Sequence, residues 1–343
     1  MTREEHARIR FLVSPPGTSV DDQRRRRQIG EHEFRAVQAL NHDGILRPRD
    51  LVETELGVGL VYPLSTEFRR LDLWLADHPE GVPLATQLDL LRQVGEAIGY
   101  AHRHRVVHRD LTPAAVLVLD RADGSVQVVV TDWQTAGSAG GTTTGPGARL
   151  VTALGTSVLN LVHGADAATR GVYQAPEGVW LREVDRIKID VFALGAVGYY
   201  LLTRRPPAAD GNALRERLQR DKGLDLAADL PQVLSSLRTL VLDATRPAVG
   251  DRLASIGAFL DKLAEVERTV AEPDQAQELD PLKALPGTVF RSRYRLQRRL
   301  VSGGATNVTL DSITVQQYAT GRQAGAIHPD TSASGWMVRN VSA

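Results

Sequence analysis

The sequence predicts an α+β fold, in which helices and antiparallel strands occupy separate parts of the chain. An amphipathic helix is indicated over 86–105, where apolar residues recur every three or four positions. A β-hairpin is indicated over 116–130, because alternating Val and Leu residues flank the turn sequence Asp123-Gly124. A second alternating stretch, interrupted by glycine, lies at 286–310. The chain therefore combines a helical part with two regions of antiparallel strands.

The length and charge of the chain define its broad class. Its 343 residues suffice for one two-lobed domain with an appendage or for two modest domains, and 42% hydrophobic residues can form a core. The 41 acidic and 41 basic residues balance, so no general attraction to nucleic acid or membranes is expected. The run R-R-R-R at 24–27 is interpreted as a solvated loop or helix start rather than as a nucleic-acid patch.

Cysteine content and hydropathy indicate the compartment. The absence of cysteine excludes disulfides and thiolate chemistry, and it fits a reducing environment. The sequence contains neither a signal peptide nor an apolar stretch of about 18 residues or more. We therefore expect a cytoplasmic protein that has no membrane partner.

The helix predicted over 86–105 carries one apolar face, with Thr86 as its expected N-cap. The face consists of Leu88, Leu91, Val94, Ile98 and Ala101. Three histidines follow, His102, His104 and His108, but no cysteine and no second cluster of ligands supports a zinc site. The apolar face of this helix is thus interpreted as part of the hydrophobic core and not as part of a metal site.

Two motifs near the hairpin carry chemistry. The first is V-V-H-R-D-L-T-P-A-A-V-L at 106–117, and the second is T-D-W-Q, at the end of the second strand. They resemble the catalytic loop and the Asp-Phe-Gly turn of protein kinases. The resemblance implies that Asp110 accepts the proton of a substrate hydroxyl and that Asp132 binds metal. Ala115 stands in place of the family's second metal ligand, and its methyl group offers no oxygen to magnesium.

Later motifs agree with the kinase C-terminal lobe in their order. Y-Q-A-P-E at 173–177 resembles the end of the activation segment, and D-V-F-A-L-G at 190–195 resembles the start of a buried helix. The resemblance implies that Arg252 pairs with Glu177 and that Asp190 receives hydrogen bonds from the catalytic loop. The structural residues implied in this way are His108, Arg109, Glu177, Asp190 and Arg252.

The N-terminal lobe departs from the family. The segment 32–46 resembles the kinase C-helix and its exit, which places Glu33 at the ion-pairing position. The segment 7–12 resembles the third strand and places Arg10 where active kinases have lysine; no lysine precedes Lys188. An Arg10–Glu33 pair would still hold the helix against the sheet, but a guanidinium does not reproduce a compact ammonium between phosphates. The alternative is an edge strand with a solvated arginine.

Nucleotide binding is expected to be weak or absent. The residues ahead of position 7 leave no room for the two strands and the glycine-rich loop that cover ATP phosphates, so we expect a truncated N-lobe sheet. Any ATP and Mg²⁺ would bind between Tyr62 and Asp132.

The expected activation segment contains the glycine-rich stretch 138–147. Its candidate phosphorylation sites are Thr142, Thr143 and Thr144. A phosphate there would pair with Arg109, as in active kinases; the alternative is a plain flexible loop. In serine/threonine kinases a threonine before the A-P-E motif contacts a lysine of the catalytic loop. Here that neighbourhood is A-T-R-G-V-Y and Thr112 replaces the lysine, so neither half of this substrate-aligning contact is clearly present.

The C-terminal part is expected to form a separate segment. Residues 269–286 are an acidic, proline-punctuated linker, and 287–310 resembles the opening hairpin of a bacterial kinase domain, in which Gly303 and Gly304 remain of the glycine loop. This hairpin either begins a second kinase-like domain or completes the sheet of the first, unless it is a stray hairpin in a tail. Residues 311–343 are expected to be a disordered tail.

The sequence thus predicts a two-lobed kinase-like domain over 1–268, with the N-lobe at about 1–62 and the C-lobe at about 63–268. Loss of the lysine, a metal ligand and the glycine loop predicts a catalytically impaired pseudokinase that acts on a protein partner by regulation or scaffolding. The alternative is a divergent serine/threonine kinase that transfers the ATP γ-phosphate to a protein hydroxyl.

Overall fold

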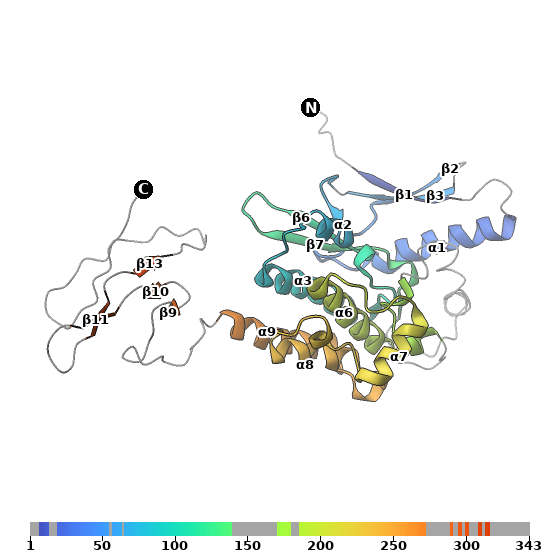
Figure 1. Ribbon diagram of the computed structural model, residues 1–343. Coiled ribbons are helices and arrows are strands. Elements are labelled where there is room, and N and C mark those ends of the chain that lie inside the picture. The colour runs from blue at the N-terminus through green and yellow to red at the C-terminus, as the bar shows by residue number, and fades with distance from the viewer. Residues whose placement is uncertain are drawn as a thin grey trace, which may run out of the picture. The chain divides into compact units, whose positions relative to one another are not determined.

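The chain divides into two compact units, Met1–Glu267 and Arg268–Ala343. The computed structural model describes residues 7–13, 19–54, 57–63, 65–138, 170–179 and 185–271, together with five short strands between 289 and 315. In the first unit, the three N-terminal strands and α1 form one lobe, and stacked helices form the other (Figure 1).

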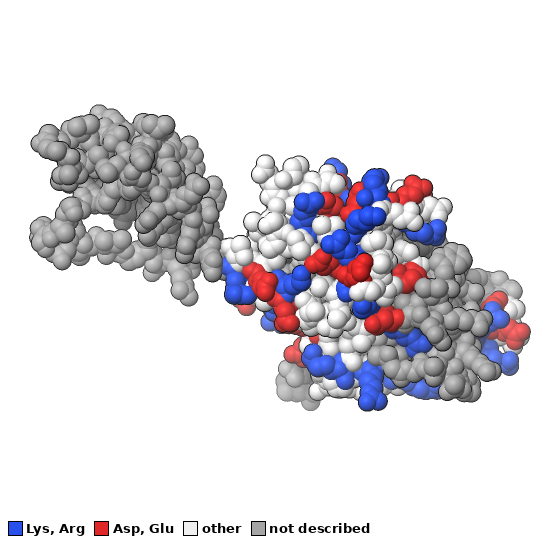
Figure 2. Space-filling view, turned by 90° about the horizontal axis from the view of Figure 1, so that it is seen from below, with Lys and Arg blue, Asp and Glu red and all other residues white. Residues whose placement is uncertain are grey.

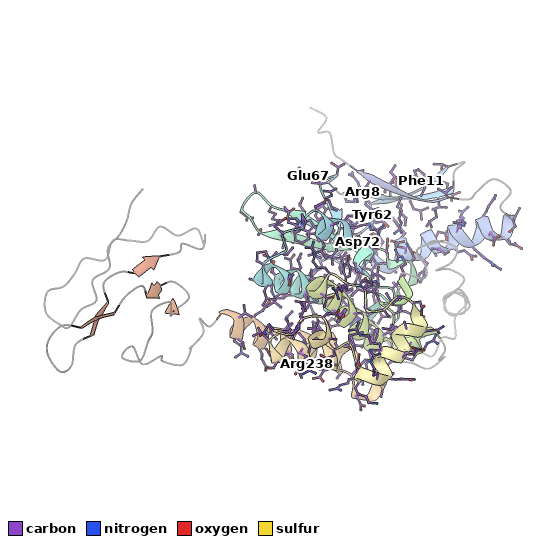
Figure 3. All side chains as sticks on the ribbon, in the orientation of Figure 1. Arg8, Phe11, Tyr62, Glu67, Asp72 and Arg238 are labelled. Carbon is purple, nitrogen blue, oxygen red and sulfur yellow. The ribbon has the colours of Figure 1, made fainter. Side chains whose placement is uncertain are left out.

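The N-lobe sheet contains the strands β1 (Arg8–Val13), β2 (Asp50–Thr54) and β3 (Gly57–Tyr62). Its order is β1-β3-β2, and both pairs are antiparallel. Arg8 pairs with Tyr62 across the sheet, and both residues are labelled in Figure 3. Val58, Leu60 and Tyr62 alternate along the central strand and are buried, as expected for a strand with one face on the core.

Helix α1 (Val20–Gln38) covers this sheet. Its first turn is stabilised because the Ser19 side chain accepts a hydrogen bond from the Asp22 amide at 3.1 Å. Its buried residues are Ile29, Gly30, Glu33 and Val37. A Cβ at Gly30 would lie 3.0 Å from Val58 Cγ1, so glycine permits the close approach of helix and strand. The arginine run 24–27 lies in the first turns, as a helix start.

The next part of the chain joins the lobes. Its elements are β4 (Arg69–Arg70), α2 (Leu71–Ala76), α3 (Leu84–Arg103), β5 (Val106–Val107), η1 (Pro113–Ala115), β6 (Val116–Asp120), β7 (Val126–Val130), η2 (Trp133–Thr135) and β8 (Gly137–Ser138). The hairpin prediction is confirmed, since β6 and β7 are antiparallel and Gly124 has φ of +80° in the turn. The N-cap prediction is wrong: α3 begins at Leu84 with Pro83 as its N-cap, so Thr86 lies inside the first turn. The missing N–H of Pro83 costs nothing there, because the amides at a helix start have no partner within the helix.

The C-lobe is built around helix α6. Its elements are η4 (Pro176–Val179), α6 (Arg186–Thr203), α7 (Gly211–Asp221), η5 (Leu226–Ala228), α8 (Ser235–Ala244), η6 (Val249–Asp251) and α9 (Ile256–Ala271). Thirteen of the α6 residues are buried, which indicates a central helix rather than a surface one. It packs between α3 and α8 (Figure 1). The two-lobed α+β fold predicted from the sequence, with a short N-lobe sheet and a helical C-lobe, is confirmed.

The second unit contains only short strands among its described residues. They are β9 (Val289–Phe290), β10 (Tyr294–Leu296), β11 (Arg299–Val301), β12 (Val308–Leu310) and β13 (Ile313–Val315). β11 pairs with β12, whereas β10 pairs with both β9 and β13. The segment 287–310 is therefore more than one hairpin. Strand β13 lies inside 311–343, where a disordered tail was expected, because Ile313–Val315 finds a partner in β10.

Candidate active site

Arg10 on strand β1 connects the sheet to α1. Its guanidinium forms ion pairs with Glu33 on α1 and with Asp132 after β7. The Tyr62 hydroxyl donates to the other Glu33 oxygen at 2.8 Å. Burial opposes the charge on Arg10, but the carboxylates of Glu33 and Asp132 outweigh it and raise its pKa. The guanidinium therefore stays charged and is shared between two acids.

Glu33 is fully buried, and burial raises its pKa while Arg10 opposes the shift. An unpaired charge in this place would be costly, so Arg10 and Tyr62 are what make the carboxylate tolerable. Tyr62 is itself buried, and burial raises its pKa as well. Its hydroxyl is directed at α1.

Asp110 in the catalytic-type loop is held by two side chains that come from beyond residue 169. Arg170 Nη1 donates to Asp110 Oδ2 at 2.9 Å, and Gln174 Nε2 donates to Asp110 Oδ1 at 2.7 Å. Burial raises the pKa of Asp110 to about 6, although Arg170 and Gln174 act in the opposite direction. Both carboxylate oxygens of Asp110 are thus engaged inside the protein.

Asp132 accepts from two arginines. Besides the pair with Arg10, its Oδ2 accepts from Arg170 Nη2 at 3.1 Å. Asp132 has φ of +65°, a left-handed conformation that Asp tolerates better than most residues. The carboxylates of Asp110 and Asp132 therefore share one guanidinium, that of Arg170.

Asp190 on α6 organises the backbone of the loop that carries Asp110. The amides of His108 and Arg109 donate to its two oxygens at 2.8 and 2.7 Å, and His102 Nε2 lies 2.8 Å from Oδ2. Burial alone would raise the pKa of Asp190, but the hydrogen bond and charge interaction with His102 outweigh it and lower the pKa. This network also explains why Arg109 can adopt φ of +69°.

His108 is a buried structural residue of the loop. Its Nε2 lies 2.9 Å from the Thr131 carbonyl, and its Nδ1 accepts from the Asp110 amide at 3.3 Å. Burial lowers the pKa of His108, which agrees with a neutral ring that donates through Nε2. The ring packs on Trp133, with 4.5 Å between centroids, and Trp133 donates to the Val130 carbonyl at 3.2 Å.

A second tie holds the turn after Asp132 to α1. His32 Nε2 lies 2.6 Å from the Ala136 carbonyl. Trp133 is fully buried, and Gln134 is nearly so, where the family has phenylalanine and a flexible glycine. Both ends of the turn are therefore packed against neighbouring elements.

The donor set does not fit a magnesium ion in this arrangement. Ala115 offers no side-chain oxygen, and the oxygens of Asp110 and Asp132 accept from Arg10, Arg170 and Gln174. Magnesium needs oxygens at about 2.1 Å in octahedral geometry, which guanidinium groups in the same place prevent. Among the described residues, no group of three or more His, Asp or Glu side chains is arranged to hold a metal ion.

Glu177 and Arg252 form the ion pair expected from the sequence. Arg252 Nη2 donates to Glu177 Oε2 at 2.9 Å, and Arg252 Nε donates to the Arg246 carbonyl at 2.7 Å. The Arg252 side chain is fully buried and lies over the Phe192 ring, 5.0 Å from its centroid. The pair joins η4 to the segment before α9.

Arg109 has a different environment from the other site arginines. Burial lowers its pKa, and the nearby charge of Arg186 acts in the same direction. The three candidate phosphorylation sites, Thr142, Thr143 and Thr144, lie outside the described residues, as do Gly303 and Gly304. Their expected roles stay predictions.

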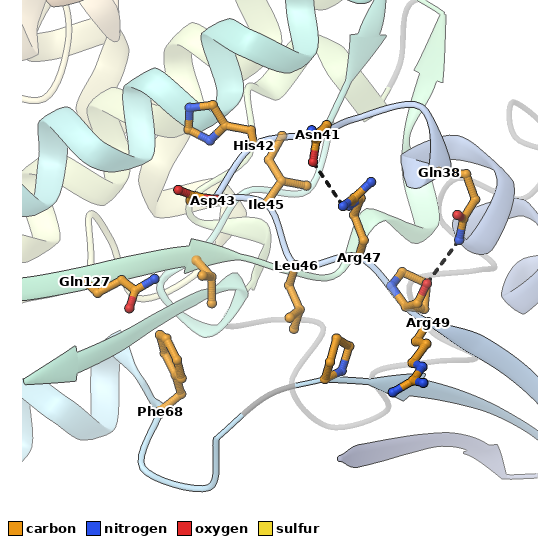
Figure 4. A pocket seen from close by; sticks show the side chains of 13 residues that line it. Gln38, Asn41, His42, Asp43, Ile45, Leu46, Arg47, Arg49, Phe68 and Gln127 are labelled. Atoms are coloured by element: carbon orange, nitrogen blue, oxygen red, sulfur yellow. Dashed lines mark hydrogen bonds between the residues drawn. The ribbon is translucent and has the colours of Figure 1, made fainter. Parts of the chain in front are cut away.

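A pocket of about 470 Å³ lies elsewhere in the domain (Figure 4). It is lined by the segment 41–49 after α1, by Pro63 and Phe68, and by Gln127 and Val129 of β7. None of the paired acids of the candidate site lines it.

The described surface carries charges of both signs. Basic and acidic side chains are interspersed on the face shown in Figure 2. In the arginine run of α1, Arg24 lies 3.7 Å from Asp21 and Arg25 lies 3.8 Å from Asp22. These contacts agree with a solvated helix start. No helix in the described part of the chain is both long and apolar enough to cross a membrane.

The architecture and the order of its motifs define a protein-kinase fold. A sheet lobe with a covering helix carries the Arg10–Glu33 pair, and the loop with Asp110 is anchored to a buried helix by Asp190.

Comparison with known proteins gives the family. Residues 18–243, more than half of the chain, match the protein kinase domain model. The chain belongs to the protein kinase family. It is 27% identical over 334 residues to Probable kinase PglW of Streptomyces coelicolor, and 28% identical over 270 residues to Serine/threonine-protein kinase PknA of Mycobacterium tuberculosis.

The two matches cover different shares of this chain and of the matched proteins. The PglW match covers 89% of this chain and 21% of that protein, and the PknA match covers 75% and 55%. The chain thus spans about a fifth and about half of their lengths. The crystal structure of the Mycobacterium tuberculosis PknI kinase domain has a TM-score of 0.53 and 22% identity, and the match covers 76% of this chain and 85% of that one. This likeness shows the fold.

Sequence reasoning identified Arg10, Glu33, Asp110 and Asp132, and the structure brings these four together. It missed Arg170 and Gln174. The signal that could have identified Arg170 is the stretch A-T-R-G-V-Y, in which arginine stands three residues before the tyrosine of Y-Q-A-P-E.

Proposed function

We propose that this protein-kinase domain is catalytically impaired and that it works as a regulatory or scaffolding module for a protein partner. The observation that carries the proposal is the position of Arg10, which is shared between Glu33 and Asp132. A phosphate-binding group at this position would have to release Glu33, which is fully buried, or Asp132, whose side chain is 13% exposed. That release is unfavourable because removing one partner of a fully buried ion pair typically costs about 3–5 kcal/mol, which is the upper bound here.

The charges of the site also argue against tight nucleotide binding. Three carboxylates, those of Glu33, Asp110 and Asp132, face two guanidinium groups, those of Arg10 and Arg170. Within the residues that the structure describes, the negative charges of this cluster outnumber the positive ones, so the phosphates of ATP would meet a net negative site. The metal ions that would bridge acids and phosphates lack an oxygen at Ala115. We therefore propose weak or absent binding of ATP and Mg²⁺.

A second candidate function is a divergent serine/threonine kinase. It is supported by the retention of Asp110 and Asp132 and by the inward position of α1, where Glu33 meets the strand residue at the lysine position. In this reading a protein hydroxyl would receive the γ-phosphate.

Transfer of labelled phosphate from Mg²⁺–ATP to a generic protein substrate and to the chain itself tests the proposal. The full chain is compared with Asp110→Asn, and we expect no incorporation above that variant. Incorporation by the wild type that is lost in Asp110→Asn would establish the kinase activity instead. If the domain is a scaffold, the wild type and Asp110→Asn bind the same protein partner. Co-purification of that partner with each of the two forms measures this.

A further inference from the structure

Arg170 reaches two acids that lie far apart in the sequence. One terminal nitrogen donates to Asp110 at 2.9 Å and the other to Asp132 at 3.1 Å. The Arg170 side chain is only 10% exposed, so water competes little with these contacts. The planar fork of a guanidinium suits two carboxylates that stand side by side.

The position of this guanidinium conflicts with that of a divalent cation. An ion bound to both Asp110 and Asp132 would compete for oxygens that already accept hydrogen bonds, because Asp110 Oδ2 and Asp132 Oδ2 accept from Arg170. Gln174 holds the remaining Asp110 oxygen at 2.7 Å and thereby aligns the carboxylate with Arg170. Two cations cannot share these oxygens because like charges a few ångströms apart repel strongly in a partly buried site.

We propose that Arg170 is a built-in counter-cation that excludes divalent metal ions from Asp110 and Asp132. The inference rests on the proposed function and adds its local cause: an autoinhibitory contact made by one side chain. Removal of that side chain opens a cation site made of two carboxylates. The domain stays impaired in phosphate transfer, because Arg10 still replaces the lysine and Ala115 still replaces the second metal ligand.

Binding of Mn²⁺ alone tests the inference without nucleotide. Free Mn²⁺ is followed by electron paramagnetic resonance during titration of the full chain, of Arg170→Met and of Arg170→Met with Asp132→Asn. Methionine keeps the apolar stem but no charge. We expect Arg170→Met to bind Mn²⁺ at least about tenfold more tightly than the wild type, and the double variant to lose the gain.

Arg220→Met is the matched control. Arg220 pairs with Asp221 on the surface, and its side chain is 70% exposed, so its removal leaves Mn²⁺ affinity at the wild-type value. Equal affinity in the wild type and in a folded Arg170→Met variant overturns the inference. Retention of the gain in the double variant also overturns it, because the bound ion would then not use Asp132.

Arg170→Gln serves if Arg170→Met does not fold. The glutamine amide can still donate a hydrogen bond to the acids but carries no charge, so Mn²⁺ should raise the Tm of this variant and leave that of the wild type unchanged. An equal Tm shift in both overturns the inference. Phosphate transfer by the wild type would overturn the proposed function alone, because Mn²⁺ affinity is read separately.

Discussion

Asp110 is a buried acid whose ionisation is linked to folding. Burial raises its pKa to about 6, whereas an unfolded Asp has a pKa of about 3.9. The folded state therefore binds a proton more tightly than the unfolded state. The contribution of Asp110 to stability is fully present below about pH 3.9, and it is lost as the pH rises through about 6, with a slope of at most about 1.4 kcal/mol per pH unit.

We expect this linkage to appear in urea unfolding of the wild type and Asp110→Asn between pH 4.5 and 7.5. The free energy of unfolding of the wild type, relative to the variant, should fall as the pH rises and level off above about pH 7. Asp123→Asn is the control. Hydrogen bonds from Ser125 lower the pKa of Asp123, so its contribution to stability is lost only below about pH 3.9, and the stability of the wild type relative to this variant should stay constant over the measured range. A relative stability of wild type over Asp110→Asn that rises with pH would contradict the expectation.

The site residues differ in how far sequence alone could reveal them. Asp110 and Asp132 lie in short motifs with recognisable neighbours, and Glu33 and Arg10 follow from the order of the N-lobe segments. The stretch A-T-R-G-V-Y draws attention to Arg170, but its contact with Asp110 spans 60 positions and follows from no local pattern. The role of Arg170 depends on the path that brings its segment back to the loop containing Asp110, and this path is determined only by the folded backbone.

At the scale of elements, α6 depends on a glycine for its packing. A Cβ at Gly195 would lie 2.7 Å from Ala244 Cβ and 2.8 Å from Thr245 Cγ2, closer than real contacts allow. Both neighbours belong to the end of α8, and Thr245 is itself fixed, since its hydroxyl donates to the Val241 carbonyl at 2.7 Å. The backbone of α6 at Gly195 therefore lies directly against the side chains of Ala244 and Thr245.

Gly195→Ala is expected to lower the free energy of unfolding by about 1–3 kcal/mol, because overpacking outweighs the better helix propensity of alanine. Gly211→Ala is the matched control at the start of α7, where an added Cβ meets nothing within 4 Å. It should be neutral or stabilise by up to about 1 kcal/mol. Urea unfolding of both variants checks this, and an equal effect of the two would contradict the packing argument.

Element boundaries were less predictable than element types. The hairpin β6–β7 followed from alternation and its Asp-Gly turn, whereas the start of α3 did not follow from Thr86. Pro83, three positions before Thr86, already stands at the start of the helix, and the local pattern cannot rank the two candidate starts. The pairing of β10 with β13 depends on contacts outside any one hairpin and was not foreseen.

At the scale of the whole chain, the division after Glu267 separates two units that differ in secondary structure. The sequence places the end of the kinase-like domain near residue 268, within α9 (Ile256–Ala271). Among the described residues, the last buried side chain of the first unit is Val266, so α9 contributes to the core of that unit.

A chain that ends after Ala271 is expected to fold and to keep the main thermal transition of the full chain. The reason is that this chain keeps the whole of α9, whose side chains Phe259, Leu263 and Val266 are buried in the core. Calorimetry of the full and shortened chains measures this. A loss of cooperative unfolding, or a Tm lowered by more than about 4 °C, which corresponds to roughly 1–2 kcal/mol in a domain of this size, would show that the second unit contributes to the core.

The guanidinium of Arg10 also has a practical consequence for chemical labelling. Reagents that attach an acyl group from a nucleotide phosphate need a nucleophilic amine beside the phosphates. Strand β1 presents a permanently charged guanidinium instead, held by Glu33 and Asp132. Such reagents would leave this domain unlabelled whether or not a nucleotide visits it. Nucleotide binding would have to be detected with a photoreactive nucleotide, whose activated group inserts into neighbouring C–H and N–H bonds.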